Sequence, residues 1–316
     1  MTKRYSNLHI QVRFAIAALL LGLATALLAA NLGGCSKGGE EAKSPGEPAK
    51  TVIQNKGSDT MVNLAQVWAE AYRQVAPDVE VEVSGGGSGV GLAALTRGAV
   101  DIANASRDIK PQETEAVKQN TGKMPAEFVV GYDALAIYVH KDNPLEEITL
   151  AQIAQIYEEG GTITKWSDLG VTLPSGQDEI IRVSRQSSSG TYEFLREHVL
   201  GNRDFKLGSR DLNGSKEVVE LVANTPGAIG YSGMGYATNG VKMLKVARAA
   251  GEPAVPPSVE ATLDKSYPIA RSLHLYTVGE PQGAVKAYID WILGPEGQRL
   301  VEESGYVPLT AAQGAK

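Results

Sequence analysis

The stretch SRQSSSGTYEFLREHVL, residues 184–200, places one arginine and a cluster of hydroxyl groups directly before a predicted helix. Arg185 supplies a positive charge and a planar fork of N–H donors, while Ser189 and Thr191 supply hydroxyls. The first backbone N–H groups of a helix are unpaired, and the helix dipole makes that end partly positive. Donors of these three kinds together favour the binding of an anion.

Two other loops repeat this chemistry. GSDTM, residues 57–61, and SGGGSGVG, residues 84–91, each join a predicted strand to a predicted helix. Glycine lets the backbone approach a ligand closely, and serine and threonine add donors. A single loop of this kind is more simply a helix cap, because Ser, Thr and Asp are preferred N-cap residues. Three in one chain favour a shared ligand at the carboxyl ends of the strands.

The same loops lack the groups that catalysis needs. They contain no histidine or cysteine, and the chain has no Rossmann fingerprint, P-loop, G-x-S-x-G elbow or spacing typical of a metal cluster. His198 falls within a predicted helix and is more simply a surface residue than a base. A site rich in donors and poor in bases is expected to bind an oxyanion without turning it over, so no enzymatic activity, metal or cofactor is predicted.

The composition predicts a globular protein with a mildly acidic surface. The 316 residues are 43% hydrophobic and 21% charged, with a formal net charge of −6. Such a charge lacks the basic footprint of a nucleic-acid-binding protein. An anion site must therefore be local, built from dipoles and one or two arginines.

The first 34 residues are predicted to be a lipoprotein signal peptide. A basic start precedes an apolar run over residues 14–34 and the single cysteine, Cys35. LGGC, residues 32–35, resembles a bacterial lipobox, so Cys35 is predicted to carry a lipid that anchors an extracytoplasmic chain to the membrane, in the periplasm or at the cell surface. An uncleaved membrane anchor is the alternative. Residues 35–50 have no large apolar side chain and predict a flexible tether.

From Thr51 onward, strands and helices alternate. Apolar residues at helical spacing, among them Leu64, Trp68 and Tyr72, predict a helix over residues 61–77, and strict alternation over residues 79–85 predicts a strand. This succession predicts an α/β fold with largely parallel sheets. Further strands are expected over 51–57, 101–106, 127–140, 180–185, 228–237 and 266–279, further helices over 89–100, 149–160, 191–200 and 282–305, and a long surface excursion over 249–266.

The ordered set of loops resembles the phosphate-binding proteins of bacterial phosphate ABC transporters, the PstS family. The resemblance covers about residues 51–310 and is carried by GSDTM, SGGGSGVGLAAL, VDIANASRDI, SRQSSSGT and TPGAIGYS. It implies an α/β, two-lobed, type II periplasmic-binding-protein fold. Each lobe is then a largely parallel sheet flanked by helices, and two crossing strands join the lobes around the anion cleft. Lobe one is expected over residues 51–133 plus 269–310, lobe two over 134–268, and a tail over 311–316.

The resemblance also implies a role and a set of contacts. The role is the binding of inorganic phosphate by a monomer, without a cofactor, and its delivery to a membrane permease driven by an ATPase. Several residues of this chain match binding positions of the family. They are the hydroxyl of Thr60 and the amide of Met61 with Ser58 nearby, the hydroxyl of Ser88, and Arg185, Ser189, Gly190 and Thr191.

Two positions depart from the family pattern. Ser106 is followed by Arg107, where many relatives have an aspartate that accepts the proton of hydrogen phosphate and repels sulfate. Ser187 stands where many relatives have an aspartate that pairs with the binding arginine. Asp59 could replace the lost acceptor or could simply cap its helix, and the sequence does not separate the two roles. Ser106, Arg107 and Asp59 therefore join the predicted site, which is expected to be more positive than in the family.

Other functions remain open from the residues alone. A receptor for another tetrahedral oxyanion, such as sulfate or molybdate, would use the same donors. A secreted phosphatase with Ser189 as nucleophile would need a base or a metal beside that serine. A structural surface lipoprotein would use the three loops only as helix caps and would bind no anion.

Overall fold

The computed structural model describes residues 50–309. The predicted signal peptide, Cys35, nearly all of the tether and the tail over residues 311–316 lie outside the described residues. Residues 50–309 belong to one compact unit. Within the part of the chain that is described, no helix combines the length and the apolar character needed to cross a bilayer.

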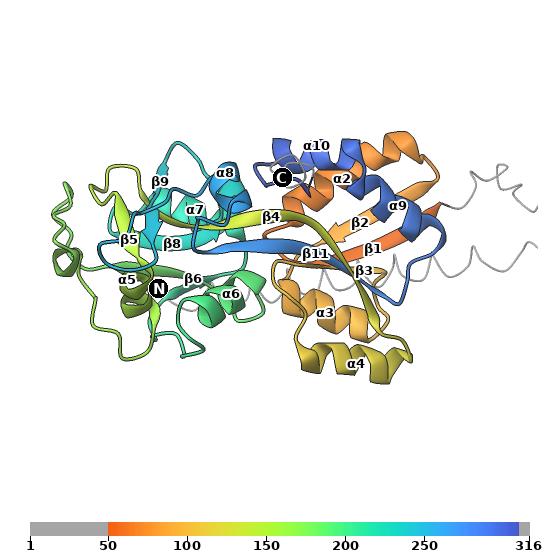
Figure 1. The fold of residues 1–316 in the computed structure, drawn as a ribbon, viewed down its shortest axis with the longest axis horizontal. Coiled ribbons are helices and arrows are strands. Elements are labelled where there is room, and N and C mark those ends of the chain that lie inside the picture. Colours follow the sequence, from red (N-terminus) through yellow and green to blue (C-terminus); the bar gives the residue numbers. More distant parts are fainter. Residues whose placement is uncertain (1–49, 310–316) are drawn as a thin grey trace, which may run out of the picture. The chain divides into compact units, whose positions relative to one another are not determined.

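A curled mixed sheet runs through the described chain (Figure 1). It contains two groups of parallel strands, one on each side of a long antiparallel pair. The strand order is β2-β1-β3-β11-β4-β8-β6-β7. The parallel groups are β1 (Thr51–Gly57), β2 (Val79–Ser84) and β3 (Ile102–Ala105), and β6 (Ile181–Arg185), β7 (Arg210–Leu212) and β8 (Ala228–Gly233). The predicted α/β class with largely parallel strand groups is confirmed.

The long antiparallel pair joins the two groups. It consists of β4 (Pro125–His140) and β11 (Ala270–Val278), which run side by side in Figure 1. Their register places Arg271 opposite Asp133 and shifts between Leu273 and His274. These strands lie in the segments predicted to cross between the lobes.

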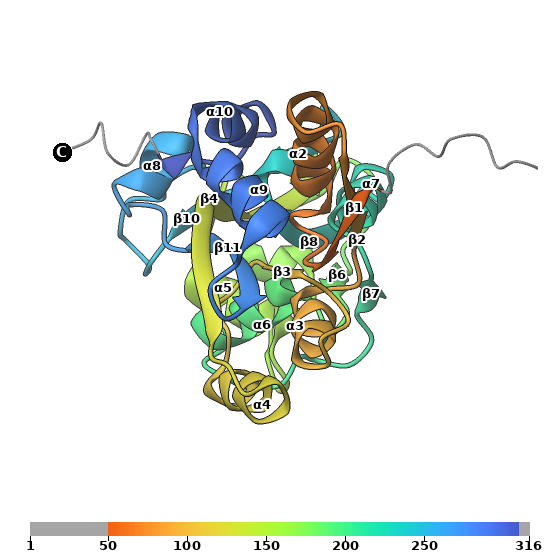
Figure 2. The ribbon, with the colours of Figure 1, turned by 90° about the vertical axis from the view of Figure 1, so that its right-hand side faces the viewer.

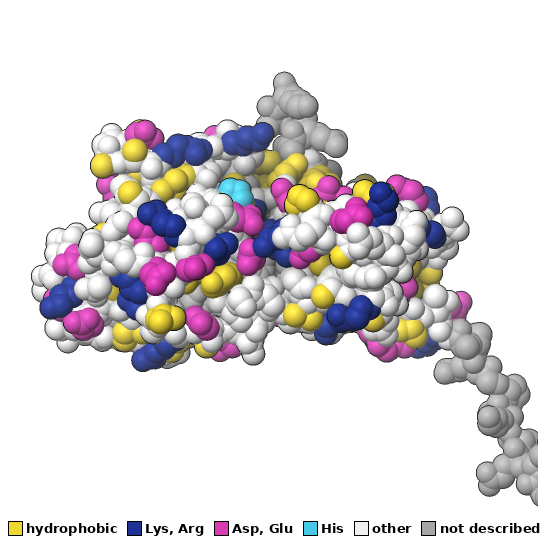
Figure 3. All heavy atoms as spheres, turned by 90° about the horizontal axis from the view of Figure 1, so that it is seen from below, with side chains coloured by type: hydrophobic (Ala, Val, Ile, Leu, Met, Phe, Trp, Pro, Cys, Tyr) yellow, Lys and Arg dark blue, Asp and Glu magenta, His cyan; other side chains and the backbone are white. Residues whose placement is uncertain are grey.

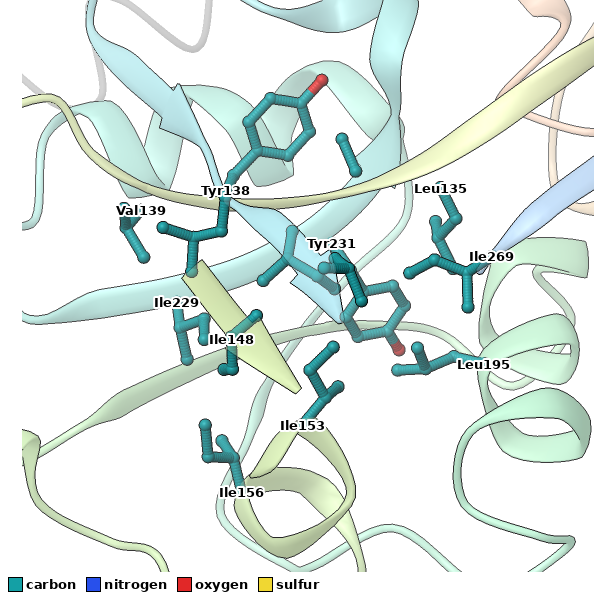
Figure 4. Packing of buried hydrophobic residues seen from close by; sticks show 14 of the residues in the cluster. Leu135, Tyr138, Val139, Ile148, Ile153, Ile156, Leu195, Ile229, Tyr231 and Ile269 are labelled. Carbon is teal, nitrogen blue, oxygen red and sulfur yellow. The ribbon is translucent and has the colours of Figure 1, made fainter. Parts of the chain in front are cut away.

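The buried hydrophobic residues form two large clusters. One lies around β8 and β4 and includes Tyr138, Ile153 and Tyr231; in Figure 4, Tyr231 and Ile153 lie on one side of these strands and the ring of Tyr138 on the other. The other lies around β1 and β11 and includes Trp68 and Tyr288. Because each large aromatic side chain removes much apolar surface from water, each cluster stabilises its own group of strands. The residue boundaries of the two predicted lobes stay a prediction.

Helices cover the sheet. In α2 (Val62–Val75), the predicted apolar stripe is buried, with Leu64 and Trp68 fully enclosed. This face packs against α9 (Gly283–Leu293) and α10 (Pro295–Glu303), which lie beside α2 in Figure 2. The other helices are α3 (Ser88–Thr96), α4 (Pro111–Thr121), α5 (Leu150–Tyr157), α6 (Gly190–His198), α7 (Ser215–Ala223) and α8 (Val259–Leu263).

Some elements differ from expectation. Helices α4 and α7 were not predicted, and α4 shows why, because only Val117 of its charged sequence is buried. The predicted surface excursion over residues 249–266 contains α8, whose Ala261 is buried in the core. Short elements complete the chain, namely β5 (Glu147–Thr149), β9 (Val241–Met243), β10 (Lys245–Ala247) and 3₁₀ turns at Trp166–Leu169 and Met234–Tyr236.

Candidate anion-binding site

The predicted hydroxyl groups come together where strands of both parallel groups end. The Ser58 hydroxyl, after β1, donates to the Ser106 hydroxyl, after β3, at 2.9 Å. The Ser88 Oγ at the start of α3 accepts from the Ser106 backbone N–H at 3.1 Å. The Thr60 and Thr191 hydroxyl oxygens, which belong to different strand groups, lie 2.8 Å apart. All five side chains are buried, so these hydroxyls bond to one another rather than to water.

Helix α6 begins against this hydroxyl cluster. A Cβ atom at Gly190 would lie 2.2 Å from the Ser88 Oγ and 2.7 Å from the Ser106 Oγ, so only glycine fits. The N-cap residue Ser189 accepts at its Oγ from the backbone N–H groups of Thr191 at 3.2 Å and Tyr192 at 3.5 Å. Capping uses the oxygen of Ser189 and leaves its O–H free to donate. Ser189 can therefore cap the helix and contact an anion together.

Arg185 ends strand β6, is buried, and contacts Asp59 in the loop that also carries Ser58 and Thr60. Its Nη1 donates to the Ser215 hydroxyl at 3.0 Å, and its Nη2 donates to the Asn213 carbonyl at 2.7 Å. Its Nε is buried without a hydrogen-bond partner among the described residues. Burial lowers the pKa of Arg185. A buried guanidinium with an unused donor is costly alone and attracts an anion.

Asp59 links the first loop to Arg185 and to the second loop. Its Oδ2 lies 3.4 Å from the Arg185 Nη2, and its Oδ1 accepts from the Gly86 N–H at 2.8 Å. Helix α2 has Met61 as N-cap and no side-chain cap, so Asp59 does not cap its helix. Burial raises the pKa of Asp59, although Gly86 and Arg185 both oppose the rise. Asp59 thus gives Arg185 a carboxylate partner. Ser187, the position at which the family pattern has an aspartate partner for this arginine, is exposed.

Two predicted site residues are already engaged elsewhere. The Arg107 guanidinium forms a bidentate pair with Glu113, at 2.8 and 2.7 Å, in the first turn of α4. Its charge is therefore balanced, contrary to the expectation of a more positive site. The Met61 N–H donates to the Ser58 carbonyl at 3.0 Å, so a ligand would have to compete for it.

Sequence reasoning missed a second buried arginine. Arg271 of β11 pairs with Asp133 of β4, with its Nε and Nη2 at 3.0 and 2.8 Å from the Oδ2. The Arg271 Nη1 also donates to the Thr191 hydroxyl at 3.0 Å and the Ser106 carbonyl at 3.2 Å, and its Nη2 to the Thr60 hydroxyl at 3.3 Å. Burial raises the pKa of Asp133. The sequence did carry a signal for this ion pair, because one predicted crossing strand contains an aspartate and the other an arginine.

Contacts between the two strand groups surround the cluster. The Gly89 N–H donates to the Ser188 carbonyl at 3.0 Å, and the Ser188 hydroxyl donates to the Gly86 carbonyl at 3.0 Å. The Tyr236 hydroxyl donates to the Asp59 carbonyl at 2.9 Å, and burial raises its pKa to about 12, which keeps it a donor. Charges of both signs are interspersed on the face in Figure 3. That face therefore carries no broad positive field.

The described network consists of hydroxyls, two guanidinium groups and the carboxylates that pair with them. No imidazole joins this network among residues 50–309. Such a site can donate many hydrogen bonds to an oxyanion and offers no imidazole base to activate a nucleophile. These groups can therefore hold an oxyanion by hydrogen bonds and charge.

Comparisons with known proteins agree with this chemistry. The model of the PBP superfamily domain matches residues 42–296. The phosphate-binding protein PstS of Pseudomonas aeruginosa is 34% identical over 269 residues, which cover 82% of this chain and 83% of that protein. The phosphate-binding protein PstS of Bacillus subtilis is 30% identical over 285 residues, which cover 87% of this chain and 89% of that protein.

Solved structures show the same likeness. A phosphate ABC transporter substrate-binding protein from Clostridium perfringens, solved with bound phosphate, is 31% identical with a TM-score of 0.71, and the match covers 82% of this chain and 100% of that one. An ABC-type phosphate transport receptor from Vibrio cholerae is 27% identical with a TM-score of 0.64, covering 81% and 99%. The predicted type II periplasmic-binding-protein fold is therefore confirmed.

Proposed function

The chain belongs to the PstS family of phosphate-binding proteins and carries a PBP superfamily domain, and from this premise we propose that it binds inorganic phosphate for import by an ABC transporter. The observation that carries the proposal is the convergence of buried Arg185 with the hydroxyls of Thr60, Ser88 and Thr191. A family name suggests the ligand, and these donors supply the chemistry to hold it.

Phosphate would replace the bonds that the hydroxyls now make with one another. Ser58 and Ser106, and likewise Thr60 and Thr191, would turn their O–H groups toward the anion. Arg185 would add charge-assisted bonds, which are stronger than neutral ones. The two predicted lobes would open about β4 and β11 to admit the anion and close to desolvate it, so that the ligand favours the closed form.

Asp59 would be the acceptor for the proton of hydrogen phosphate. Its carboxylate is next to Arg185 and the Gly86 amide, at the edge of the hydroxyl cluster. A carboxylate gains a hydrogen bond from a protonated anion and repels one that has no proton. This arrangement would favour phosphate over sulfate.

A receptor for a different tetrahedral oxyanion is the second candidate. It is favoured by the engagement of Asp59, because each of its two oxygens already has a donor in Gly86 or Arg185. A carboxylate occupied in this way is a weaker acceptor for a ligand proton. Sulfate or molybdate would then compete with phosphate.

The proposed cellular setting follows from the family and from the N-terminal sequence. We place the chain outside the cytoplasm as a monomer, anchored by a lipid on Cys35, where it would deliver phosphate to a permease that an ATPase drives. The relatives are named as binding or transport proteins and not as enzymes. Their names support transport, while the anchor rests on the sequence of residues 32–35.

Titration calorimetry of the purified protein, stripped of bound anions, tests the proposal. Phosphate should bind one to one, and a large excess of sulfate should leave its affinity unchanged. Equal competition by sulfate would support the second candidate. Failure of both anions to bind would overturn the site itself, and the three loops would then be helix caps and interdomain contacts.

A further inference from the structure

A separate cluster of polar side chains surrounds His274 on β11. The His274 Nδ1 lies 2.9 Å from the Glu127 Oε1, and its Nε2 lies 3.2 Å from the Asp108 Oδ1. One ligand atom from each of the three residues lies within 4.8 Å of the others. The cluster belongs to β4, β11 and the loop after β3, so residues distant in sequence meet here. No sequence pattern predicted it, and a site without metal was expected.

The imidazole is buried but unsatisfied. The His274 side chain is only 4% exposed, yet neither ring nitrogen forms a directed hydrogen bond within the described residues. Its two carboxylate neighbours are close but lie off the axes along which ring N–H groups would point. Buried polar groups without partners are rare in folded proteins. An electron-pair acceptor on a ring nitrogen would remove this deficit.

The spacing suits a metal ion. Two ligands bound to one cation at about 2.0–2.2 Å and at right angles are about 3 Å apart, and each lies well off the other's lone-pair axis. The 2.9 Å between the His274 Nδ1 and the Glu127 Oε1 matches this arrangement, whereas Asp108 lies 3.2 Å from the other ring nitrogen and would have to turn to reach the same cation. Asp108 is 90% exposed, so its carboxylate is free to move onto the cation from solvent.

A second layer of contacts holds two of the three side chains. The Tyr276 hydroxyl donates to the Glu127 Oε1 at 2.5 Å and accepts from the Ile109 N–H at 3.0 Å. The ring of Tyr276 also stacks on His274, with centroids 5.6 Å apart and an interplanar angle of 17°. Metal sites need such outer contacts, because these orient the ligands.

We propose that Asp108, Glu127 and His274 form a site for a divalent transition-metal cation. One imidazole nitrogen and two carboxylate oxygens suit Zn²⁺ in particular, with water completing its coordination. This inference goes beyond phosphate binding and does not depend on it. The site is nevertheless connected to the anion site, because Asp108 follows Ser106 by two residues and His274 follows Arg271 by three.

Calorimetric titration of Zn²⁺ into the purified, phosphate-free protein tests this site. We expect binding at one ion per chain. Asp108→Asn and Glu127→Gln should each weaken it by at least about tenfold, because each removes a charged ligand. Asp78→Asn changes an exposed aspartate outside the cluster and should leave the affinity unchanged. Thermal melting without metal checks that each variant is folded, which makes substitution of the buried His274 unnecessary.

The ligand set can also be read spectroscopically. Co²⁺ in place of Zn²⁺ should shift the imidazole proton resonances of His274 strongly, and those of the His140 and His198 rings, which lie outside the cluster, little. Absence of one-to-one binding would overturn the proposal. So would a Zn²⁺ affinity in either cluster variant equal to that of the Asp78→Asn control, because the ion would then be bound elsewhere.

Discussion

The three buried arginines around the anion site differ in what balances their charge. Arg107 has a bidentate carboxylate partner in Glu113, and Arg271 directs two of its N–H groups at one oxygen of Asp133. Arg185 has only the 3.4 Å contact with Asp59, a carboxylate whose pKa is itself raised. Because an incompletely paired buried cation is costly, an anion gains most from Arg185. We therefore expect Arg185 to contribute the largest share of the affinity for the anion.

Replacement of Arg185 should show this share. Arg185→Lys keeps the charge but loses the fork of donors that reaches Ser215 and Asn213 as well as the ligand. Loss of one charge-assisted hydrogen bond at about 1.5–3 kcal/mol should weaken phosphate binding by about 10- to 150-fold. Calorimetry measures this loss. Arg210→Lys, at an exposed position of β7, is the matched control, and equal affinity in the two variants would contradict the assignment.

Part of this residue set could be predicted and part could not. The hydroxyls and Arg185 lie in loops whose local composition is distinctive, so the sequence alone indicated them. Arg271 and Asp133 lie inside strands and are 138 residues apart in the chain. The sequence of one strand does not show which residue of another strand will lie opposite a given charge. The pairing of Arg107 with Glu113 could have been predicted, because Glu113 is only six residues later in the chain. It was missed because the helix that begins there was not predicted.

Asp59 predicts a pH dependence of stability. Its folded pKa is raised above the ordinary value of 3.8, chiefly because burial disfavours the charged form. The folded state therefore holds the proton more tightly than the unfolded state, and this stabilisation is present below pH 3.8 and is lost as pH rises through the folded pKa. The difference in unfolding free energy between the wild-type protein and Asp59→Asn should fall over that window.

Urea unfolding of both proteins at a series of pH values measures the difference. Above the folded pKa the difference should be constant, because the carboxylate is then ionised in both states. A difference that rises with pH across the window would mean that ionised Asp59 stabilises the fold, and the raised pKa would be contradicted.

At the scale of elements, the start of α6 is fixed by one glycine. Gly190 lets the helix approach the Ser88 and Ser106 hydroxyls more closely than any side chain permits. Ser189 caps the same helix, so the cap, the glycine and the anion donors occupy one turn. The close approach of this helix to α3 thus depends on the absence of a side chain at Gly190, while Phe194 and Leu195 pack α6 into the core.

Gly190→Ala should displace the helix start. The new methyl group would lie 2.2 Å from the Ser88 Oγ, a distance that the structure must relieve by shifting α6 or turning the serine. We expect phosphate affinity to fall by about tenfold or more and stability by about 1–3 kcal/mol, as for overpacked cores. Gly89→Ala makes the same change in the first turn of α3, where the nearest atom is 3.4 Å away, and should have little effect.

The elements themselves were predictable where their patterns were strong. The apolar stripe of α2 and the alternation of β2 both indicated the right structure. Helix α4 was not predicted, because its exposed, charged sequence has no apolar stripe. Buried Val117 and contacts in the first turn hold this helix in place. Helix α7 carried a usable signal in Val218, Val219 and Val222, which are buried on one face.

At the scale of the whole molecule, binding depends on contacts between the two strand groups. Lys110, at the N-cap of α4, pairs with Glu193 and approaches Glu197 of α6 at 3.8 Å. These side chains are partly exposed, so each such pair contributes about 0.2–1 kcal/mol. Because these pairs join α4 to α6, their energy would favour the closed form in the proposed mechanism rather than either core alone.

Lys110→Met should therefore weaken phosphate binding by about two- to fivefold, since the closed form loses about that much free energy. Calorimetry at low ionic strength measures the change, which salt should diminish. Lys118→Met removes a lysine from the last turn of the same helix and is expected to bind phosphate like the wild-type protein. Unchanged or tighter binding by Lys110→Met would show that the pair does not assist closure.

The most direct test of the central claim is a crystal structure of the protein grown with phosphate. We expect one phosphate in contact with the Arg185 guanidinium and the Ser189 and Thr191 hydroxyls. The mutual bonds of Thr60 with Thr191 and of Ser58 with Ser106 should then be replaced by bonds to the anion. A phosphate bound elsewhere, with both of those hydroxyl pairs intact, would contradict it.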